Sequence, residues 1–246
     1  MTASAQWLVP DWPAPPGVRA FVTTRAGGVS TGEYASLNIG YSSGDDPANV
    51  ARNRAIVRAQ LPSEPRWLKQ VHGTHAAHLD RVEDVPTADA ALTAQPGRVA
   101  VVLTADCMPL FFCDDAGRCV AVAHAGWRGM SAGVIESTVR AMQVEPSRVM
   151  AWMGPAIGPD AFEVGPEVRE AFMAAEPSAQ SAFRAHKPGK YLADLYALAR
   201  GRLALAGVEH VHGGGFCTYH EPERFFSYRR KQASGRMGAF IWIEPR

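Results

Sequence analysis

Residues 106–129 read DCMPLFFCDDAGRCVAVAHAGWRG, and the predicted fold is built around this stretch. Two apolar runs flank the DDAG of residues 114–117, whose composition is typical of a turn. Short apolar runs on either side of a turn predict a β-hairpin whose strands are buried on both faces. Cys107 precedes the first run and His124 follows the second. If the strands pair across the turn, the thiol and the imidazole share the open end of the hairpin, and we expect an active site there.

The composition is that of a soluble globular protein. The 246 residues allow a sizeable core, and 47% hydrophobic with 20% charged residues are ordinary values. A formal net charge of +1 gives no electrostatic reason to expect nucleic acid or an anionic membrane as a partner. No apolar run approaches the ~18 residues of a membrane span. No apolar heptad is present, and we expect a monomer.

The first residues and the cysteines favour a cytoplasmic protein. The start, MTASAQWLVP, has neither a basic region nor a long apolar run, so we expect no signal peptide. The four cysteines, Cys107, Cys113, Cys119 and Cys217, form no CxxC pair. We therefore expect reduced thiols, which leaves a thiolate available to the chemistry of the site.

Strands and helices are expected in an order without strict alternation. The patterns predict strands at 18–24, 66–71, 100–104, 149–153, 208–212 and 239–243, and helices at 47–60, 130–143, 166–175 and 191–205. Asp46 followed by proline is a typical start for the first of these helices. Residues 80–98 are polar and are expected to form an irregular surface excursion. The pattern favours one α+β domain over residues 1–246, with a mixed β-sheet core flanked by helices.

Three residues, His72, Cys107 and His124, share one setting, because each lies at the end of an apolar strand next to glycine or polar residues. One thiolate and two imidazoles suit a catalytic zinc, which uses three protein ligands and keeps a fourth position for water or substrate. Such a zinc would lower the pKa of bound water toward ~7 or polarise a phosphate or a base. The spacing alone does not bring the three together, and a structural cysteine with two hydrogen-bonded histidines is the alternative.

The same atoms also fit a second chemistry. Cys107 can be a nucleophile that His124 activates, as in Cys–His hydrolases. Both interpretations need a thiolate beside an imidazole, so the sequence does not separate them.

Three further residues are candidates for binding substrate. Arg128 lies just ahead of a predicted helix N-terminus, where N–H groups and the helix dipole favour an anion. Asn38 can add a hydrogen bond and Arg54 a guanidinium. The alternative for each is ordinary capping or a surface ion pair.

Motifs along nearly the whole chain resemble the YfiH-like family, also called the polyphenol oxidase or laccase-domain family and peptidoglycan editing factor. The matching stretches are TRAGGVS (24–30), SLNIG (36–40), GDDP (44–47), NR (53–54), KQVHG (69–73), ADCMP (105–109), AHAGWRG (123–129), GPAIGP (154–159), FEVG (162–165), CT (217–218), FFSYRR (225–230) and GRM (235–237). The Asp-Cys and HAGWRG pieces are highly specific. Many relatives have a histidine where this chain has Ser42, a difference that leaves the three candidate ligands intact.

This resemblance implies a single α+β domain similar to the cytotoxic-necrotizing-factor-like fold class. It implies metal ligands at His72, Cys107 and His124, with zinc as the metal and copper as the other possibility. It further implies phosphorolysis of purine nucleosides (adenosine, inosine, guanosine and methylthioadenosine) and deamination of adenosine. The contacts to nucleoside and phosphate would fall on Asn38 and Arg54.

Three other functions compete with this one. A copper-dependent polyphenol oxidase is an older label of the family, but three ligands in one set fall short of the several copper sites that four-electron oxygen reduction requires. A Cys107-nucleophile amide hydrolase, acting in peptidoglycan precursor editing, needs no metal. A purine-binding module without catalysis is the third.

Overall fold

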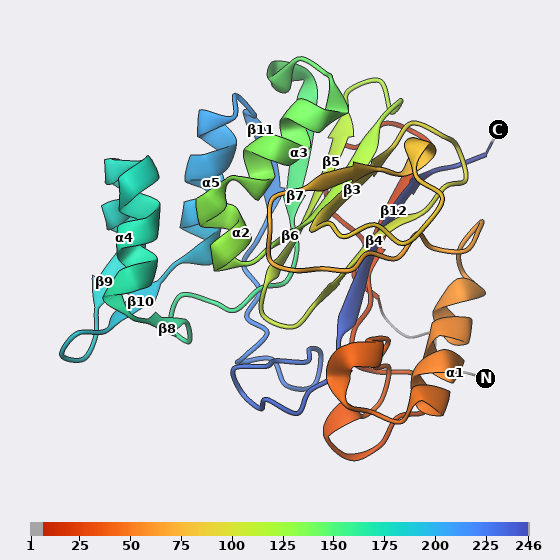
Figure 1. Ribbon diagram of the computed structural model, residues 1–246, viewed down its shortest axis with the longest axis horizontal. Coiled ribbons are helices and arrows are strands. Elements are labelled where there is room, and N and C mark those ends of the chain that lie inside the picture. The colour runs from red at the N-terminus through yellow and green to blue at the C-terminus, as the bar shows by residue number, and fades with distance from the viewer. Residues whose placement is uncertain (1–6, 246) are drawn as a thin grey trace.

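A six-stranded mixed sheet, in the order β11-β7-β5-β6-β3-β2, lies at the centre of the protein (Figure 1). The computed structural model describes residues 7–245. Strands β2 and β3, and β7 and β11, pair in parallel, whereas the other neighbours are antiparallel. The strands are β2 (Ala76–His78), β3 (Ala90–Thr93), β5 (Met108–Asp114), β6 (Val120–Ala125), β7 (Val149–Met153) and β11 (His210–Gly213). The predicted hairpin is β5 with β6, and the α+β class with a mixed sheet is confirmed.

A second sheet, β1-β12-β4, covers one face of the central sheet, and helices cover the other (Figure 1). Its antiparallel strands are β1 (Val18–Val22), β4 (Ala100–Thr104) and β12 (Met237–Ile243). Alternate residues of β5 point to the two sides: Phe111 packs among residues of the second sheet, and Leu110 and Phe112 pack with helices. Burial of both faces explains why β5 and β6 read as continuous apolar runs.

The helices lie around these sheets. They are α1 (Pro47–Arg58), α2 (Trp127–Ala132), α3 (Val134–Met142), α4 (Pro166–Ala175) and α5 (Leu195–Leu205). Short 3-10 helices are η1 (Gly32–Tyr34), η2 (Tyr41–Ser43), η3 (Leu79–Arg81), η4 (Pro146–Arg148) and η5 (Pro177–Ala182). The predicted start of α1 is confirmed, because the Asp46 carboxylate accepts from Ala48 N at 2.9 Å. In the described part of the chain no helix has both the length and the apolar character needed to cross a membrane.

Two of the predicted helices differ from the structure. The helix expected at 130–143 is divided into α2 and α3 at Gly133, whose φ of +104° suits glycine and ends the first helix. The helix expected at 191–205 begins only at Leu195, because the Asp194 carboxylate caps it by accepting from Tyr196 N and Ala197 N. The residues before the cap form β10 (Tyr191–Ala193) in a small sheet with β8 (Glu163–Val164) and β9 (Phe183–Ala185).

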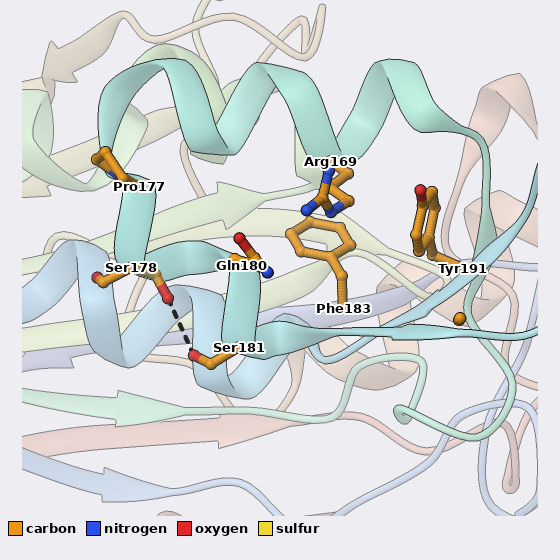
Figure 2. Close-up of a pocket in the computed structure, with 8 residues that line it drawn as sticks. Arg169, Pro177, Ser178, Gln180, Ser181, Phe183 and Tyr191 are labelled. Carbon is orange, nitrogen blue, oxygen red and sulfur yellow. Dashed lines mark hydrogen bonds between the residues drawn. The ribbon is translucent and has the colours of Figure 1, made fainter.

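A hollow of about 490 Å³ lies between α4, η5, β9 and β10 (Figure 2). Its lining includes Arg169, Phe183 and Tyr191, with the guanidinium of Arg169 over the ring of Tyr191. None of the residues that the sequence marked as functional lines this hollow.

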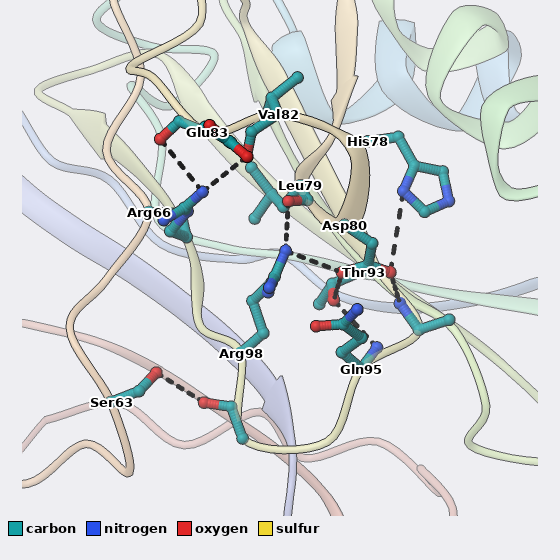
Figure 3. Close-up of polar contacts among 12 residues, drawn as sticks. Ser63, Arg66, His78, Leu79, Asp80, Val82, Glu83, Thr93, Gln95 and Arg98 are labelled. Carbon is teal, nitrogen blue, oxygen red and sulfur yellow. Dashed lines mark hydrogen bonds and ion pairs between the residues drawn. The ribbon is translucent and has the colours of Figure 1, made fainter.

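The expectation of an irregular polar excursion over residues 80–98 was wrong, since the segment contains the fully buried strand β3. Several of its polar groups are paired within the fold (Figure 3). The Asp80 carboxylate accepts from Thr93 Oγ1 at 2.6 Å and pairs with Arg98, whose guanidinium also donates to the carbonyl of Leu79. Pairing of this kind lets polar sequence lie against a core.

The strand expected at 66–71 was also wrong. Only isolated bridges form there, from Arg66 to Ala100 and from Lys69 to Thr87. The Gln70 side chain takes the place of a strand partner, because it bonds both the N–H and the carbonyl of Leu103 on β4, at 2.7 and 2.9 Å. The segment still leads to His72, which lies at the open end of the β5–β6 hairpin.

Candidate metal centre

The three candidate ligands come together at the open end of the β5–β6 hairpin. One ligand atom from each of His72, Cys107 and His124 lies within 4.8 Å of the other two. Pro109 pairs with His124 across the hairpin, and Cys107 stands just before β5, so the thiol and that imidazole share one end. In residues 7–245 no other group of three or more His, Cys, Asp or Glu residues is placed to hold a metal ion.

The backbone around this trio is held in unusual conformations. His72 has a φ of +59° and Asp106 a φ of +82°, in the left-handed region that costs about 1–3 kcal/mol for a residue other than glycine. The turn before Cys107 is fixed because the Asp106 carboxylate accepts from Thr218 Oγ1 at 2.6 Å and from Arg229 N at 2.7 Å. Surrounding hydrogen bonds therefore maintain a backbone that local preference disfavours.

Asp89, directly before β3, organises two of the three ligands. One carboxylate oxygen accepts from His124 Nδ1 and from His72 N, both at 2.9 Å. The other accepts from Val71 N at 3.1 Å and from Gly73 N at 2.7 Å. With Nδ1 so engaged, Nε2 is the ring nitrogen of His124 left for a metal ion. A carboxylate behind a ligating histidine is the usual outer layer of a metal site.

The Asp89 carboxylate stays ionised although it is fully buried. Burial alone raises its pKa, but the hydrogen bonds from His124, Gly73 and Val71 outweigh this effect and hold the pKa below its ordinary value. Sequence reasoning missed Asp89. The available signal is an acidic residue directly before the apolar run at 90–92, within the segment for which an irregular excursion is predicted.

The thiol of Cys107 is activated by its neighbours. Burial alone raises its pKa, but the charges of and hydrogen bonds from His124 and His72 outweigh burial and lower the pKa to about 6. Burial also lowers the pKa of His124, yet the Cys107 thiolate and Asp89 raise it to about 9. The other two cysteines of the hairpin behave in the opposite way, because burial and Asp114 raise the pKa of Cys113 and Cys119 to about 12.

Two glycines of the HAGWRG motif make room for the ligands. A Cβ on Gly126 would lie 2.7 Å from the sulfur of Cys107, and a Cβ on Gly129 would lie 2.8 Å from the carbonyl oxygen of Gly73. Any side chain at Gly126 would push the thiol away, so the close approach requires glycine there.

The three predicted substrate residues have other contacts. Asn38 is fully buried: its amide donates to Ser43 Oγ and Asp45 Oδ2, and its oxygen accepts from Gly40 N and Arg236 N. With these hydrogen bonds, the Asn38 side chain connects the loop of residues 40–45 to the backbone at Arg236.

The two arginines are likewise engaged with aromatic rings. The Arg54 guanidinium lies between the rings of Tyr41 and Trp67, 4.3 and 3.6 Å from their centroids, and donates to the carbonyl of Ile39. Arg128 is exposed, lies inside the six-residue helix α2 and stacks on Trp127 at 4.3 Å. In the part of the chain described here, no hydrogen bond or ring contact joins either arginine to the trio.

The donor chemistry of the trio fits a transition-metal ion. A thiolate with two imidazoles is a ligand set for a catalytic zinc, and the same donors also bind copper. Because the pKa of His124 is about 9, its ring would release the Nε2 proton when a metal ion binds. The Asp89 carboxylate fixes the tautomer of His124 that such binding needs. The geometry therefore defines a candidate metal-dependent enzyme.

The chain belongs to the family described as multi-copper polyphenol oxidoreductase laccase, whose model matches residues 19–244. It is 54% identical over 239 residues to purine nucleoside phosphorylase YfiH of Escherichia coli K12, covering 96% of this chain and 98% of that relative. It is 51% identical over 239 residues to purine nucleoside phosphorylase PA4543 of Pseudomonas aeruginosa, covering 97% and 98%. The resemblance to the YfiH-like family is thereby confirmed.

Solved structures agree with this assignment. Protein NMB0706 of Neisseria meningitidis superposes with a TM-score of 0.94 at 49% identity, covering 97% of this chain and 99% of the other. YlmD of Geobacillus stearothermophilus superposes with a TM-score of 0.90 at 33% identity, covering 97% and 96%.

Replacing Asp89 by asparagine is expected to weaken zinc binding about 10- to 100-fold. One of the two oxygens becomes an NH₂ group, which cannot accept the two hydrogen bonds that this oxygen receives from the four donors around Asp89. Competition with a chromogenic chelator measures the zinc affinity. Asp115→Asn, which alters an exposed carboxylate paired with Arg148, is the matched control and should bind zinc like the wild type. Equal zinc affinity in both variants would refute the role given to Asp89.

Proposed function

We propose that the protein is a zinc-dependent purine nucleoside phosphorylase with adenosine deaminase activity, and that it acts on adenosine, inosine, guanosine and methylthioadenosine. The observation that carries this proposal is the convergence of His72, Cys107 and His124 within 4.8 Å. Support comes from relatives named purine nucleoside phosphorylase that match almost the full chain at more than half identity.

In phosphorolysis, an oxygen of monohydrogen phosphate forms a bond to C1′ of the ribose while the bond from C1′ to the purine nitrogen breaks. The purine nitrogen keeps the bonding pair, and the proton of the phosphate is transferred, in net terms, to the base. A bound zinc would act as a Lewis acid toward an oxygen of the attacking species. Deamination would use the same centre, with water as the nucleophile at C6 and ammonia as the leaving group.

The chain's own residues prepare this centre. Asp89 holds the His124 ring in one orientation and the backbone of His72 in its left-handed conformation. The low pKa of Cys107 supplies a thiolate at neutral pH. Gly126 leaves the sulfur uncovered by any side chain at that position. Preorganisation of this kind means that the ligands need little rearrangement when a metal ion binds.

The test uses protein purified without added metal. Mass spectrometry measures its zinc and copper, and chromatography measures the free base released from adenosine and inosine with and without phosphate. About one zinc per chain and base release that depends on phosphate would support the proposal. Base release with no dependence on phosphate would indicate a hydrolase, and copper with phenol oxidation would support the older label.

A Cys107-nucleophile hydrolase is the second candidate, because one observation favours it. Asp89, His124 and Cys107 form a carboxylate–imidazole–thiol series, which is also the arrangement of Cys–His hydrolases. Amide hydrolysis that persists in strong chelator and is lost on alkylation of Cys107 would select it over the zinc enzyme.

Alkylation also gives a direct prediction for the thiols. In chelator-treated protein at pH 7, iodoacetamide should modify Cys107 and leave Cys113 and Cys119 unmodified, because a pKa of about 6 favours the thiolate and a pKa of about 12 disfavours it. Peptide mass spectrometry reads each cysteine separately. Added zinc should slow the modification of Cys107. A Cys107 that reacts equally fast with and without zinc would contradict its assignment as a ligand.

A further inference from the structure

Arg236 lies beside the metal centre, although no role was predicted for it from the sequence. Strand β12 pairs antiparallel with β4 and begins at Met237, which lies opposite Thr104. The residue before Met237 therefore runs alongside the residues after Thr104, and these are the residues that lead into Asp106 and Cys107. Neighbouring strands are less than 6 Å apart at such positions. The charges of Cys107 and Asp106 act on the Arg236 guanidinium, as expected for this placement.

Hydrogen bonds hold the Nη1 end of the Arg236 guanidinium and the backbone of the residue. Its Nη1 donates to the carbonyl oxygens of Ser234 at 2.7 Å and Gly235 at 3.0 Å, and its backbone N–H donates to Asn38 Oδ1 at 2.9 Å. Its side-chain stem packs over Gly40, where a Cβ would come within 2.6 Å of Cγ. These contacts hold the guanidinium in one orientation.

Within the described part of the chain, the opposite edge of the guanidinium makes no hydrogen bond or ion pair, and the face of the group lies 5.8 Å from the ring centroid of Tyr228. In residues 7–245, neither Nε nor Nη2 of Arg236 donates a hydrogen bond, and Arg236 is in none of the ion pairs. Nε–H and Nη2–H lie on the same edge of the planar group and together match two oxygens of a phosphate. The side chain is only half-buried, which leaves it accessible. Burial lowers the pKa of Arg236, but an arginine remains a cation.

The other arginines around the site are committed elsewhere. Arg54 lies between two aromatic rings, and Arg128 stacks on Trp127. Arg229 donates to the carbonyl of Glu163, and Arg230 donates to the carbonyls of Thr218, Tyr219 and Phe225. Arg229 is exposed, and its guanidinium lies over the Phe162 ring, 5.4 Å from the centroid. Arg236 differs from these arginines because its half-buried guanidinium combines a fixed orientation, an unpaired Nε–Nη2 edge and a place within reach of the charges of Cys107 and Asp106.

We propose that the Nε–Nη2 edge of Arg236 binds the inorganic phosphate that attacks the nucleoside, beside the metal centre. The proposal rests on the phosphorylase function proposed above. It also gives Asn38 a different role from the one expected, since Asn38 positions Arg236 through its backbone and does not itself contact substrate. Arg236 stays protonated throughout and transfers no proton; it neutralises the charge of the phosphate.

The test compares Arg236→Gln and Arg236→Lys with Arg140→Gln, which removes the same charge from an exposed position on α3. In Arg236→Gln the KM for phosphate should rise roughly 10- to 100-fold, while the KM for inosine and the zinc content stay near the wild-type values. Arg236→Lys should be intermediate, because it keeps the charge but loses the paired donors. Arg140→Gln should match the wild type. An unchanged KM for phosphate in Arg236→Gln would overturn the proposal.

A binding measurement separates this proposal from the function on which it rests. Inorganic phosphate should raise the Tm of the wild-type protein as its concentration rises, and should raise that of Arg236→Gln much less. If the wild type shows this rise but releases no base, the phosphorylase function fails and the phosphate site stands. If phosphate stabilises both proteins equally, the assignment of Arg236 fails whatever the activity.

Discussion

Cys107→Ala is expected to lose zinc and phosphorolysis together. The substitution removes the thiolate from a set of three ligands and leaves two imidazoles, which is fewer than a catalytic zinc uses. A metal ion contributes several kcal/mol of transition-state stabilisation, and each 1.36 kcal/mol is tenfold in rate. The rate should therefore fall by about 10²- to 10³-fold or more. Zinc content and initial rates with inosine and phosphate, measured on the same preparation, check the result.

Cys217→Ala is the matched control for this variant. Cys217 is partly exposed, and its sulfur accepts from Gly158 N and His220 N, with no place in the trio. Its removal should leave the zinc content and the rate close to wild-type values. A Cys107→Ala protein that kept full zinc and full phosphorolysis would refute the proposed metal centre, and the same losses in both variants would indicate general damage to the fold.

Phe111→Ala is expected to lower the free energy of unfolding by about 3–5 kcal/mol. Phe111 is fully buried on β5, between the central sheet and the second sheet, and its ring stacks on Trp152 with centroids 5.8 Å apart. Both the lost burial and the remaining cavity contribute to this cost. Urea unfolding followed by tryptophan fluorescence measures it.

Val85→Ala is the control, because it also replaces an apolar residue by alanine but at an exposed position. Val85 is 64% exposed, so its replacement should change the free energy of unfolding by less than about 0.5 kcal/mol. An equally small loss in the free energy of unfolding for Phe111→Ala and Val85→Ala would contradict the contribution of Phe111 to the core between the two sheets.

The hairpin and the trio could be predicted from the sequence because their signals are local. The apolar runs of β5 and β6 are uninterrupted, the turn between them has typical turn residues, and the start of α1 has its cap and proline next to each other. Cys107 and His124 are adjacent to the same hairpin, so pairing of the strands was enough to place them at one end. His72 was expected there from its strand-end setting and from the resemblance.

The contacts of Asp89, Asn38 and Arg236 are visible only in the tertiary structure. Each acts through hydrogen bonds to residues far away in the sequence: Asp89 bonds the ring of His124, 35 residues along, and Asn38 bonds the backbone of Arg236, 198 residues along. The false strand at 66–71 has the same origin, because the Gln70 side chain bonds β4 from 33 residues away. Apolar periodicity predicts which segments are buried. It carries no information on which polar side chain meets which backbone group, since that depends on how the buried segments pack together.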